Sequence, residues 1–240
     1  MKILVAIKEV PDGEGGFRIN EADAHALETA LCLKDAGCGR VVAVTAGPER
    51  AVAILTRALA LGADRAVFLS AGGAPPPSGL VLARALAGIV REEAPDLILC
   101  GVASGDNGSG RVGPMLAALL DFPWTGCVTD LRLCPGGRSV RAVREVEGGK
   151  RLAFTMDLPA LATIQTSART LRYPTLSRML AANKAEIPRL DIASLCPGEP
   201  LEEILSADPP ARRPAGEMLS GAAPEKAERL AAILRERGFL

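Results

Sequence analysis

The stretch APDLILCGVASGDNGSGRVGPMLAALL, residues 94–120, decides how this chain is expected to fold. It opens with an apolar run, 96–101, that is typical of a strand buried on both faces. A glycine-rich loop follows, and residues 113–122 then have the composition of a helix, in which Pro114 is tolerated because it lies in the first turn. A strand, a glycine-rich turn and a helix in this order predict one unit of a parallel α/β sheet.

The same alternation continues upstream of this stretch. Asn20 is expected to cap the first helix, and Gly62 is expected to end the second. Short β-rich runs predict strands at residues 2–7, 40–46 and 65–70, and helical periodicity predicts helices at about 20–37, 48–62 and 79–93. The fold class is therefore α/β, an open and mostly parallel sheet with flanking helices.

Downstream of residue 125 the pattern changes. Residue patterns typical of strands and turns follow one another there, with Gly148 and Gly149 as a candidate hairpin turn. They predict a β-meander or a sheet edge. Beyond residue 168 the chain is irregular and poor in sheet signals, apart from an amphipathic helix near 224–237. A segment of this kind is expected to pack on something else, such as a partner subunit.

Composition excludes several classes of function. The 28 basic residues balance the 28 acidic ones, which argues against nucleic acid as a partner. A single histidine, His25, and six cysteines without a C-x-x-C pair supply metal sites poorly, so we expect no metal and free, mostly buried thiols. No apolar run is long enough for a membrane span or a signal-peptide core, so we expect a cytoplasmic protein that is not membrane-embedded.

The glycine-rich loop contains G-x-G-x-x-G at residues 108–113. A dinucleotide fingerprint needs its first glycine directly after the first strand and an acidic residue about 20 positions later. Here Gly108 lies well past the end of about the fourth strand, and the acidic candidates, Asp121 and Asp130, stand in the wrong context. The glycines still allow backbone N–H groups to approach an anion at a helix start, although a tight turn alone explains them equally well.

Six segments resemble, in order, the beta subunit of electron-transfer flavoproteins. They are residues 1–12, 19–37, 41–69, 94–120, 143–149 and 158–187, with weaker similarity at 206–216 and in the last helix. The resemblance implies an adenine-nucleotide-binding α/β domain at 1–190 and a C-terminal arm at 191–240 that packs on the partner subunit. The nucleotide is AMP with a structural role in typical members, and FAD in electron-bifurcating members.

Carried over position by position, the resemblance implies a nucleotide site at the carboxyl ends of the strands. Its residues would be Ala6, Asn20, Glu21, Ala22, Asp23, Ala46, Gly101, Val102, Ala103, Ser104, Gly105, Asp106, Asn107, Gly108, Ser109, Gly110, Arg111 and Val112. Two departures bear on it: many members have Gln where Arg111 stands, and the excursion between the first strand and the first helix is shorter here. A guanidinium at Arg111 suits the phosphates of AMP and of FAD equally.

The resemblance also implies partners. A flavin-carrying alpha subunit would form a heterodimer with this chain, taking electrons from acyl-CoA or other dehydrogenases, as in fatty acid beta-oxidation, and passing them to a quinone reductase. Leu176 matches a leucine that anchors in an apolar pocket of the dehydrogenase, and Tyr173, Arg178 and Glu145 are assigned to partner binding. Packing of Leu176 on the chain's own core is the alternative. No residue is expected to be catalytic.

Two alternatives to this electron carrier remain at this stage. One is a subunit of a bifurcating flavoprotein whose own FAD is redox-active, and nothing in the sequence decides against it. The other is a stand-alone nucleotide-binding regulator of the universal-stress-protein type. The long irregular tail argues against the regulator, because a free-standing sensor needs no such arm.

Overall fold

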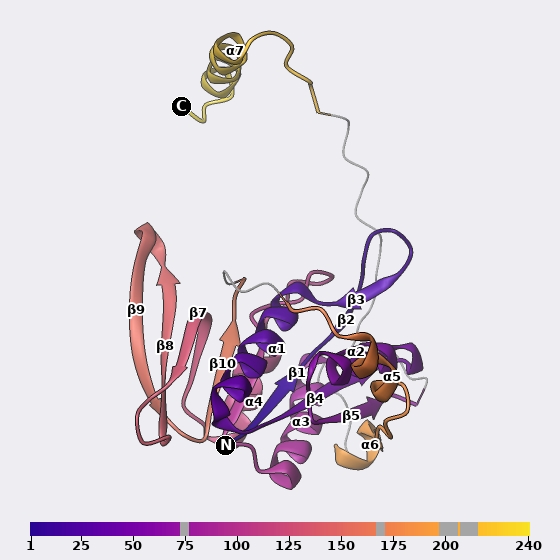
Figure 1. Ribbon diagram of the computed structural model, residues 1–240. Helices are drawn as coiled ribbons and strands as arrows, with labels where there is room; N and C mark the ends of the chain where they lie inside the picture. The colour runs from indigo at the N-terminus through magenta and orange to yellow at the C-terminus, as the bar shows by residue number, and fades with distance from the viewer. Residues whose placement is uncertain (73–76, 167–170, 197–205, 207–215) are drawn as a thin grey trace. The chain divides into compact units, whose positions relative to one another are not determined.

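The alternating apolar runs form the central sheet of an α/β fold in the computed structural model (Figure 1), which describes residues 1–72, 77–166, 171–196, 206 and 216–240. Among these residues one sheet has the strand order β11-β5-β4-β1-β6-β10-β7-β8-β9. Its strands are β1 (Lys2–Ala6), β4 (Arg40–Gly47), β5 (Arg65–Ser70), β6 (Leu97–Gly101), β7 (Trp124–Leu133), β8 (Ser139–Val146), β9 (Lys150–Asp157), β10 (Ala160–Ile164) and β11 (Arg189–Asp191).

The chain divides into two units, Met1–Glu203 and Ile204–Leu240, and the sheet belongs to the first. Helices of this unit are α1 (Glu21–Leu33), α2 (Val52–Leu61), α3 (Gly79–Glu93), α4 (Val112–Leu120), α5 (Leu176–Ala182) and α6 (Ile192–Leu195). The second unit contains α7 (Ala223–Glu236), an amphipathic helix as predicted. No helix in the described part of the chain is both long and apolar enough to span a bilayer.

Helices cover both faces of the sheet, which explains its continuous apolar strands. Ile3 and Val5 of β1 pack with α1 and α2, whereas Leu4 between them packs with α3 and α4 on the other face. All three side chains are fully buried. Successive residues of a strand point to opposite faces, so every position of such a strand has to be apolar.

Most predicted elements are confirmed, with adjusted ends. Strands β1, β4, β5 and β6 and helix α3 lie where the sequence places them. Helix α1 ends at Leu33, and a π-helical turn, Lys34–Cys38, follows it directly. Gly37 in this turn takes a left-handed conformation with φ +81°, which prevents the helix from continuing further. The predicted meander is the antiparallel β7-β8-β9 edge of the sheet, with Gly148 and Gly149 in the turn between β8 and β9.

The segment after residue 168 departs from the expectation of a chain poor in sheet. β11 pairs in parallel with β5, with Arg189 beside Phe68, and extends the sheet at that edge. Helix α5 packs on α2 and α6 packs on α3. A strand of three residues, with only Leu190 half-buried, carries too little alternation for sequence analysis to detect.

Candidate functional site

The loops that follow β1, β4 and β6 all leave the sheet at the carboxyl ends of its strands, which we call the carboxyl edge. β1 lies between the other two strands in parallel register, with Ala6 beside Val44 of β4 and Cys100 of β6. The chain runs from β1 outward through β4 to β5 and then returns to place β6 on the other side of β1. Such a reversal of strand order opens a crevice at the carboxyl ends, where ligands of open α/β sheets bind.

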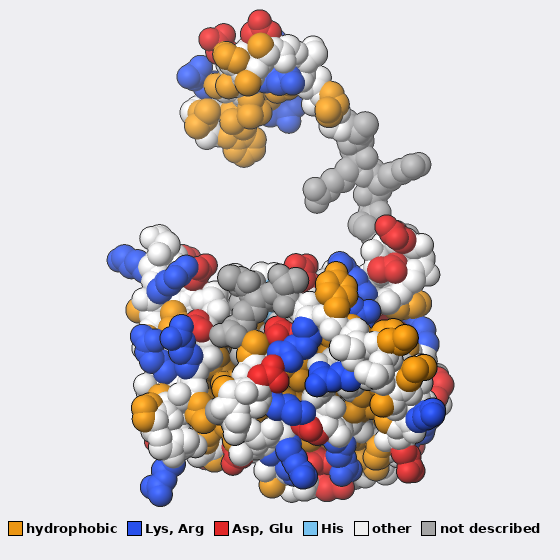
Figure 2. All heavy atoms as spheres, in the orientation of Figure 1, with side chains coloured by type: hydrophobic (Ala, Val, Ile, Leu, Met, Phe, Trp, Pro, Cys, Tyr) orange, Lys and Arg blue, Asp and Glu red, His pale blue; other side chains and the backbone are white. Residues whose placement is uncertain are grey.

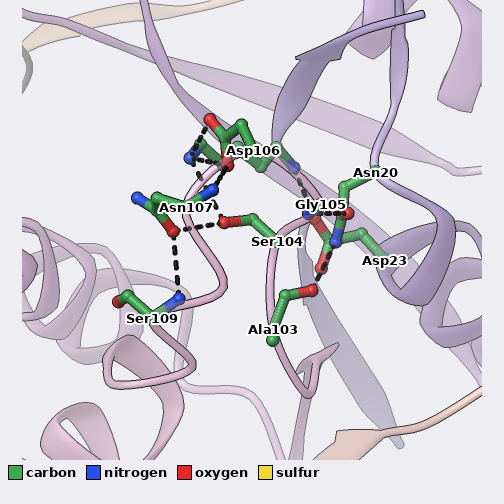
Figure 3. A network of polar contacts seen from close by, with 9 residues as sticks. Asn20, Asp23, Ala103, Ser104, Gly105, Asp106, Asn107 and Ser109 are labelled. Carbon is green, nitrogen blue, oxygen red and sulfur yellow. Dashed lines mark hydrogen bonds and ion pairs between the residues drawn. The ribbon is translucent and has the colours of Figure 1, made fainter. Parts of the chain in front are cut away.

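Asn20 holds the loop after β6 through its side-chain amide (Figure 3). Its Nδ2 donates to the Ala103 carbonyl at 2.9 Å, and its Oδ1 accepts the Gly105 N–H at 3.0 Å. Asn20 does precede α1, but its side chain makes no capping hydrogen bond. The predicted capping role is therefore wrong, because both polar ends of the amide are engaged by a loop more than 80 residues away along the chain.

Asp23, in the first turn of α1, joins the ends of β1 and β6. Its carboxylate accepts the Lys8 N–H at 2.8 Å and the Gly101 N–H at 2.7 Å. Burial raises the pKa of Asp23 from 3.8 to about 6, against the lowering effect of these two hydrogen bonds and of Asn20. Glu21 and Ala22 lie between Asn20 and Asp23 at the start of the same helix.

The loop is also held by hydrogen bonds within itself (Figure 3). Asn107 Oδ1 accepts from the Ser104 hydroxyl at 2.7 Å and from the Ser109 N–H at 3.1 Å. The Gly108 N–H donates to the Ser104 carbonyl at 2.8 Å, and the Asn107 N–H donates to the Asp106 carboxylate at 2.8 Å. Asp106 and Asn107 therefore form turns by side-chain-to-backbone bonding.

Lys8 is a member of this cluster that sequence reasoning missed. Its ammonium donates to both oxygens of Asp106, at 2.8 and 2.6 Å, and lies 3.4 Å from the Ser104 hydroxyl. Partial burial opposes ionisation of Asp106, but Lys8 and Ser104 outweigh it and hold the pKa of that carboxyl below its usual value. The signal was the position of Lys8, two residues after Ala6 at the carboxyl end of β1.

Two glycines are required by the packing of the loop. A Cβ on Gly101 would lie 2.4 Å from Asp23 Oδ1, and a Cβ on Gly110 would lie 2.7 Å from the Val102 carbonyl oxygen. Gly110 also has φ +55°, which side chains with a Cβ rarely adopt. Close packing of the backbone therefore explains both glycines, since Gly101 lies against α1 and Gly110 lies against Val102 of the same loop.

The loop leads into the N-terminus of α4. Arg111 stands at the N-cap position without a side-chain capping bond, and Pro114 in the first turn has no N–H. The first-turn N–H groups of Val112 and Gly113 and the cationic side chain of Arg111 make the start of α4 suited to an anion, whereas the Lys8 ammonium is bound to Asp106. The residues present therefore fit a phosphate group. Ala6 and Ala46, half-buried at the ends of β1 and β4, add only small side chains to the same edge.

The described cysteines and His25 differ in burial. Burial, with the neighbouring Asp23, raises the pKa of Cys100 to about 12, so its thiol stays protonated. Among the cysteines with described side chains all are free, but only Cys100 is buried and the others are half-buried, so the predicted burial holds for one of them. His25 is half-buried in the middle of α1.

The residues assigned to partner binding fall in two places. Leu176 opens α5 and is 69 % exposed, Tyr173 before it is 88 % exposed, and Arg178 is exposed on the same helix. Packing of Leu176 on the chain's own core is therefore excluded. Hollows of about 480 and 320 Å³ lie beside α5, and both are lined by Ala182.

Glu145 lies elsewhere, on β8 near the opposite edge of the sheet from α5. Its carboxylate pairs with Arg151 of β9 at 3.2 Å, and both side chains are well exposed. Figure 2 shows basic side chains gathered over β8 and β9, where Arg141 and Lys150 are exposed as well. Glu145 is thus a paired surface acid in this chain, and its contact with a partner stays a prediction.

Comparison with known proteins adds an independent finding. Residues 12–195 match a family model described as the electron transfer flavoprotein domain. The chain is 33 % identical over 239 residues to the electron transfer flavoprotein subunit beta of Bacillus subtilis, covering 98 % of this chain and 92 % of that protein. It is 31 % identical to the subunit of the same name from Bradyrhizobium diazoefficiens, covering both proteins fully, and 31 % identical to the mitochondrial one of Arabidopsis thaliana, covering 92 % and 94 %.

Proposed function

Because the chain belongs to the electron transfer flavoprotein family, among its beta subunits, we propose that it pairs with an alpha subunit and holds a nucleotide at the carboxyl edge of its sheet. The heterodimer takes electrons from dehydrogenases, such as acyl-CoA dehydrogenases, and delivers them to a quinone reductase. In this proposal the nucleotide is AMP, and FAD is carried by the alpha subunit. The free thiols of the described cysteines favour a reducing compartment, the cytoplasm.

The observation that carries the proposal is the group of donors where the strand order reverses. Arg111 precedes α4, and the first-turn N–H groups of α4 lack a side-chain cap. Cationic side chains beside a helix N-terminus bind phosphate, which every candidate nucleotide carries. Asp106 is the one acidic group of the loop, and the Lys8 ammonium balances its charge.

The chain's own residues bind and orient, and they perform no bond-making step. The buried Cys100 is kept protonated, so it is no nucleophile beside the nucleotide. AMP supplies no redox chemistry when bound, and it acts by stabilising the folded state to which it binds. Asn20 and Asp23 keep the loop after β6 in place for that binding.

The test is co-expression with an electron transfer flavoprotein alpha subunit from the same organism. We expect a stable heterodimer that contains FAD. With an acyl-CoA dehydrogenase and its substrate, the rate at which a terminal dye is reduced should rise with the heterodimer concentration and then saturate. Failure of the two chains to co-purify, or a dye reduction rate independent of the heterodimer, would contradict the proposal.

A further inference from the structure

Arg172 lies four residues before Leu176, and its guanidinium is held by α1 and by the turn that follows it. Nε lies 3.1 Å from each oxygen of Glu28, and Nη2 lies 2.9 Å from Glu28 Oε1. Nη1 pairs with Asp35 at 2.8 Å. The backbone N–H of Arg172 also donates to Glu28 Oε2, at 3.1 Å. One carboxylate of α1 thus binds both the side chain and the main chain of Arg172.

This ion pair differs from an ordinary surface salt bridge in its burial. The Glu28 side chain is only 7 % exposed and that of Arg172 is 26 % exposed. Hydrogen bonds to Glu28 raise the pKa of Arg172 above its ordinary value, so the guanidinium remains charged. Leu171, the preceding residue, packs against the core cluster that contains α1 and α2. A pair of this kind costs far more to break than an exposed one.

The chain beyond Arg172 is exposed but fixed at both ends. Tyr173 and Leu176 project into solvent, and Thr175 caps α5 by accepting the Arg178 N–H. Helix α5 rests on α2, where Ala182 is buried. Arg172 is thus the attachment to α1 at one end of residues 173–176, which we call the docking segment, and α5 is the attachment at the other.

We propose that Arg172 is a positioning residue for partner docking, and that its ion pair with Glu28 holds the docking segment in the conformation that the dehydrogenase binds. The inference rests on the proposed function, because it requires Leu176 to enter the partner. Ordering a loose segment on binding lowers affinity, whereas a segment that is already ordered avoids this cost. Lys cannot replace Arg172 fully, because an ammonium lacks the planar fork that binds both carboxylate oxygens.

The test compares three variants as co-expressed heterodimers. Glu28→Gln/Arg172→Gln removes both charges, so that no buried carboxylate is left unpaired. Arg172→Lys keeps the charge and loses the fork. Arg189→Gln is the control, since it removes another arginine of an ion pair, the one with the exposed Glu49. We measure the dehydrogenase's KM for the heterodimer, its kcat at saturation, and the bound nucleotide.

We expect the KM of the double variant to rise about tenfold, from the lost preorganisation, with kcat and nucleotide content unchanged. The KM of Arg172→Lys should lie between those of the double variant and the wild type, and the KM of the control should equal that of the wild type. Adding Leu176→Ala to the double variant should raise KM no further than Leu176→Ala alone, because Arg172 acts through the docking segment. A full additive increase would overturn the inference.

The two possible failures are distinguishable. If Leu176→Ala leaves KM unchanged, the proposed docking fails and the role of Arg172 fails with it. If Leu176→Ala raises KM and Glu28→Gln/Arg172→Gln does not, the docking stands and the positioning role is overturned. Should the variants not fold, hydrogen exchange on the unchanged heterodimer decides. The Arg172 N–H should exchange much more slowly than that of Tyr173, and equal rates would overturn the inference.

Discussion

Lys8 and Asp23 show how individual residues assemble the site. The Lys8 N–H donates to Asp23 in α1, while the Lys8 ammonium donates to Asp106 in the loop after β6. Asp23 in turn accepts the Gly101 N–H at the end of β6. Two side chains therefore join the first strand, the first helix and the loop, and a change at either one is expected to loosen all three.

Asp23 should make the stability of the heterodimer depend on pH. Its pKa is about 6 in the folded state and 3.8 ordinarily, so between these values the folded chain keeps a proton that the unfolded chain has lost. Its contribution to the free energy of unfolding therefore falls as pH rises from about 4 to about 6, by about 3 kcal/mol in all. Below pH 4 both states hold the proton and the contribution is constant.

The measurement is thermal melting of the wild-type and Asp23→Asn heterodimers between pH 4 and 7. Asparagine does not titrate, and its single oxygen cannot accept both the Lys8 and the Gly101 N–H groups. The variant should therefore melt earlier throughout. The difference in melting temperature between the wild type and the variant should be larger at pH 4.5 than at pH 7, because only the wild type loses stability as the pH rises across this window. Parallel melting curves at all pH values would show that Asp23 does not titrate there.

At the scale of elements, helix α1 supports both proposed functional regions. Asn20 and Asp23 at its start hold the loop after β6, and Glu28 in its second half holds Arg172. The helix has five further residues as buried hydrophobics, so it is a rigid support. These are Ala26, Leu27, Ala30, Leu31 and Leu33.

The helices and strands of the sheet are predictable from the sequence because their signals are local. An apolar run buried on both faces, such as β1, and a helix with a clear period, such as α3, are specified by neighbouring residues. The side-chain partners of Lys8, Asn20 and Arg172 lie 83 to 144 positions away, and nothing in the local sequence reports them. The loop's position could be predicted, but the residues that hold it in place could not.

Leu176, at the start of α5, is predicted to anchor the dehydrogenase. Because the side chain is 69 % exposed, Leu176→Ala should leave the melting temperature and the nucleotide content unchanged. Burying one leucine in a partner's pocket is worth about 1.5 to 3 kcal/mol, so docking should weaken about 10- to 150-fold. The measurement is the rate of electron transfer from dehydrogenase to the heterodimer at limiting heterodimer concentration.

Leu180 is the matched control, because it lies one turn further along α5 and is 57 % exposed. If Leu176 is a single anchor, Leu180→Ala should change the transfer rate by less than about threefold, as for most contacts around a hot spot. Equal losses from both variants would indicate a broad apolar face in place of one anchor. An early melting transition for Leu176→Ala would show that the side chain supports the fold.

At the scale of the whole molecule, the order of the strands decides where a ligand can bind. β1 lies between β4 and β6, so the loops that follow all three strands meet at one edge. The antiparallel β7-β8-β9 strands extend the sheet beyond β10, on the side of β6 that lies away from β1. The central claim is that the crevice holds a nucleotide through the loop of residues 101–112.

Quantifying the nucleotides released from the purified heterodimer tests this claim most directly, with Gly110→Ala and Gly137→Ala alongside the wild type. Both glycines have a left-handed φ, which costs a non-glycine residue about 1 to 2 kcal/mol. A Cβ at Gly110 would press on the Val102 carbonyl at 2.7 Å, whereas one at Gly137, in the turn before β8, meets nothing within 4 Å.

The account predicts one FAD and one AMP per heterodimer for the wild type and for Gly137→Ala. Gly110→Ala should keep its FAD and lose most of its AMP, because its loop can no longer hold the conformation that presents the N–H groups of α4. Two FAD and no AMP would instead assign a flavin to the crevice. A wild-type heterodimer that releases no nucleotide beyond one FAD, or a Gly110→Ala variant that keeps a full AMP, would contradict the account.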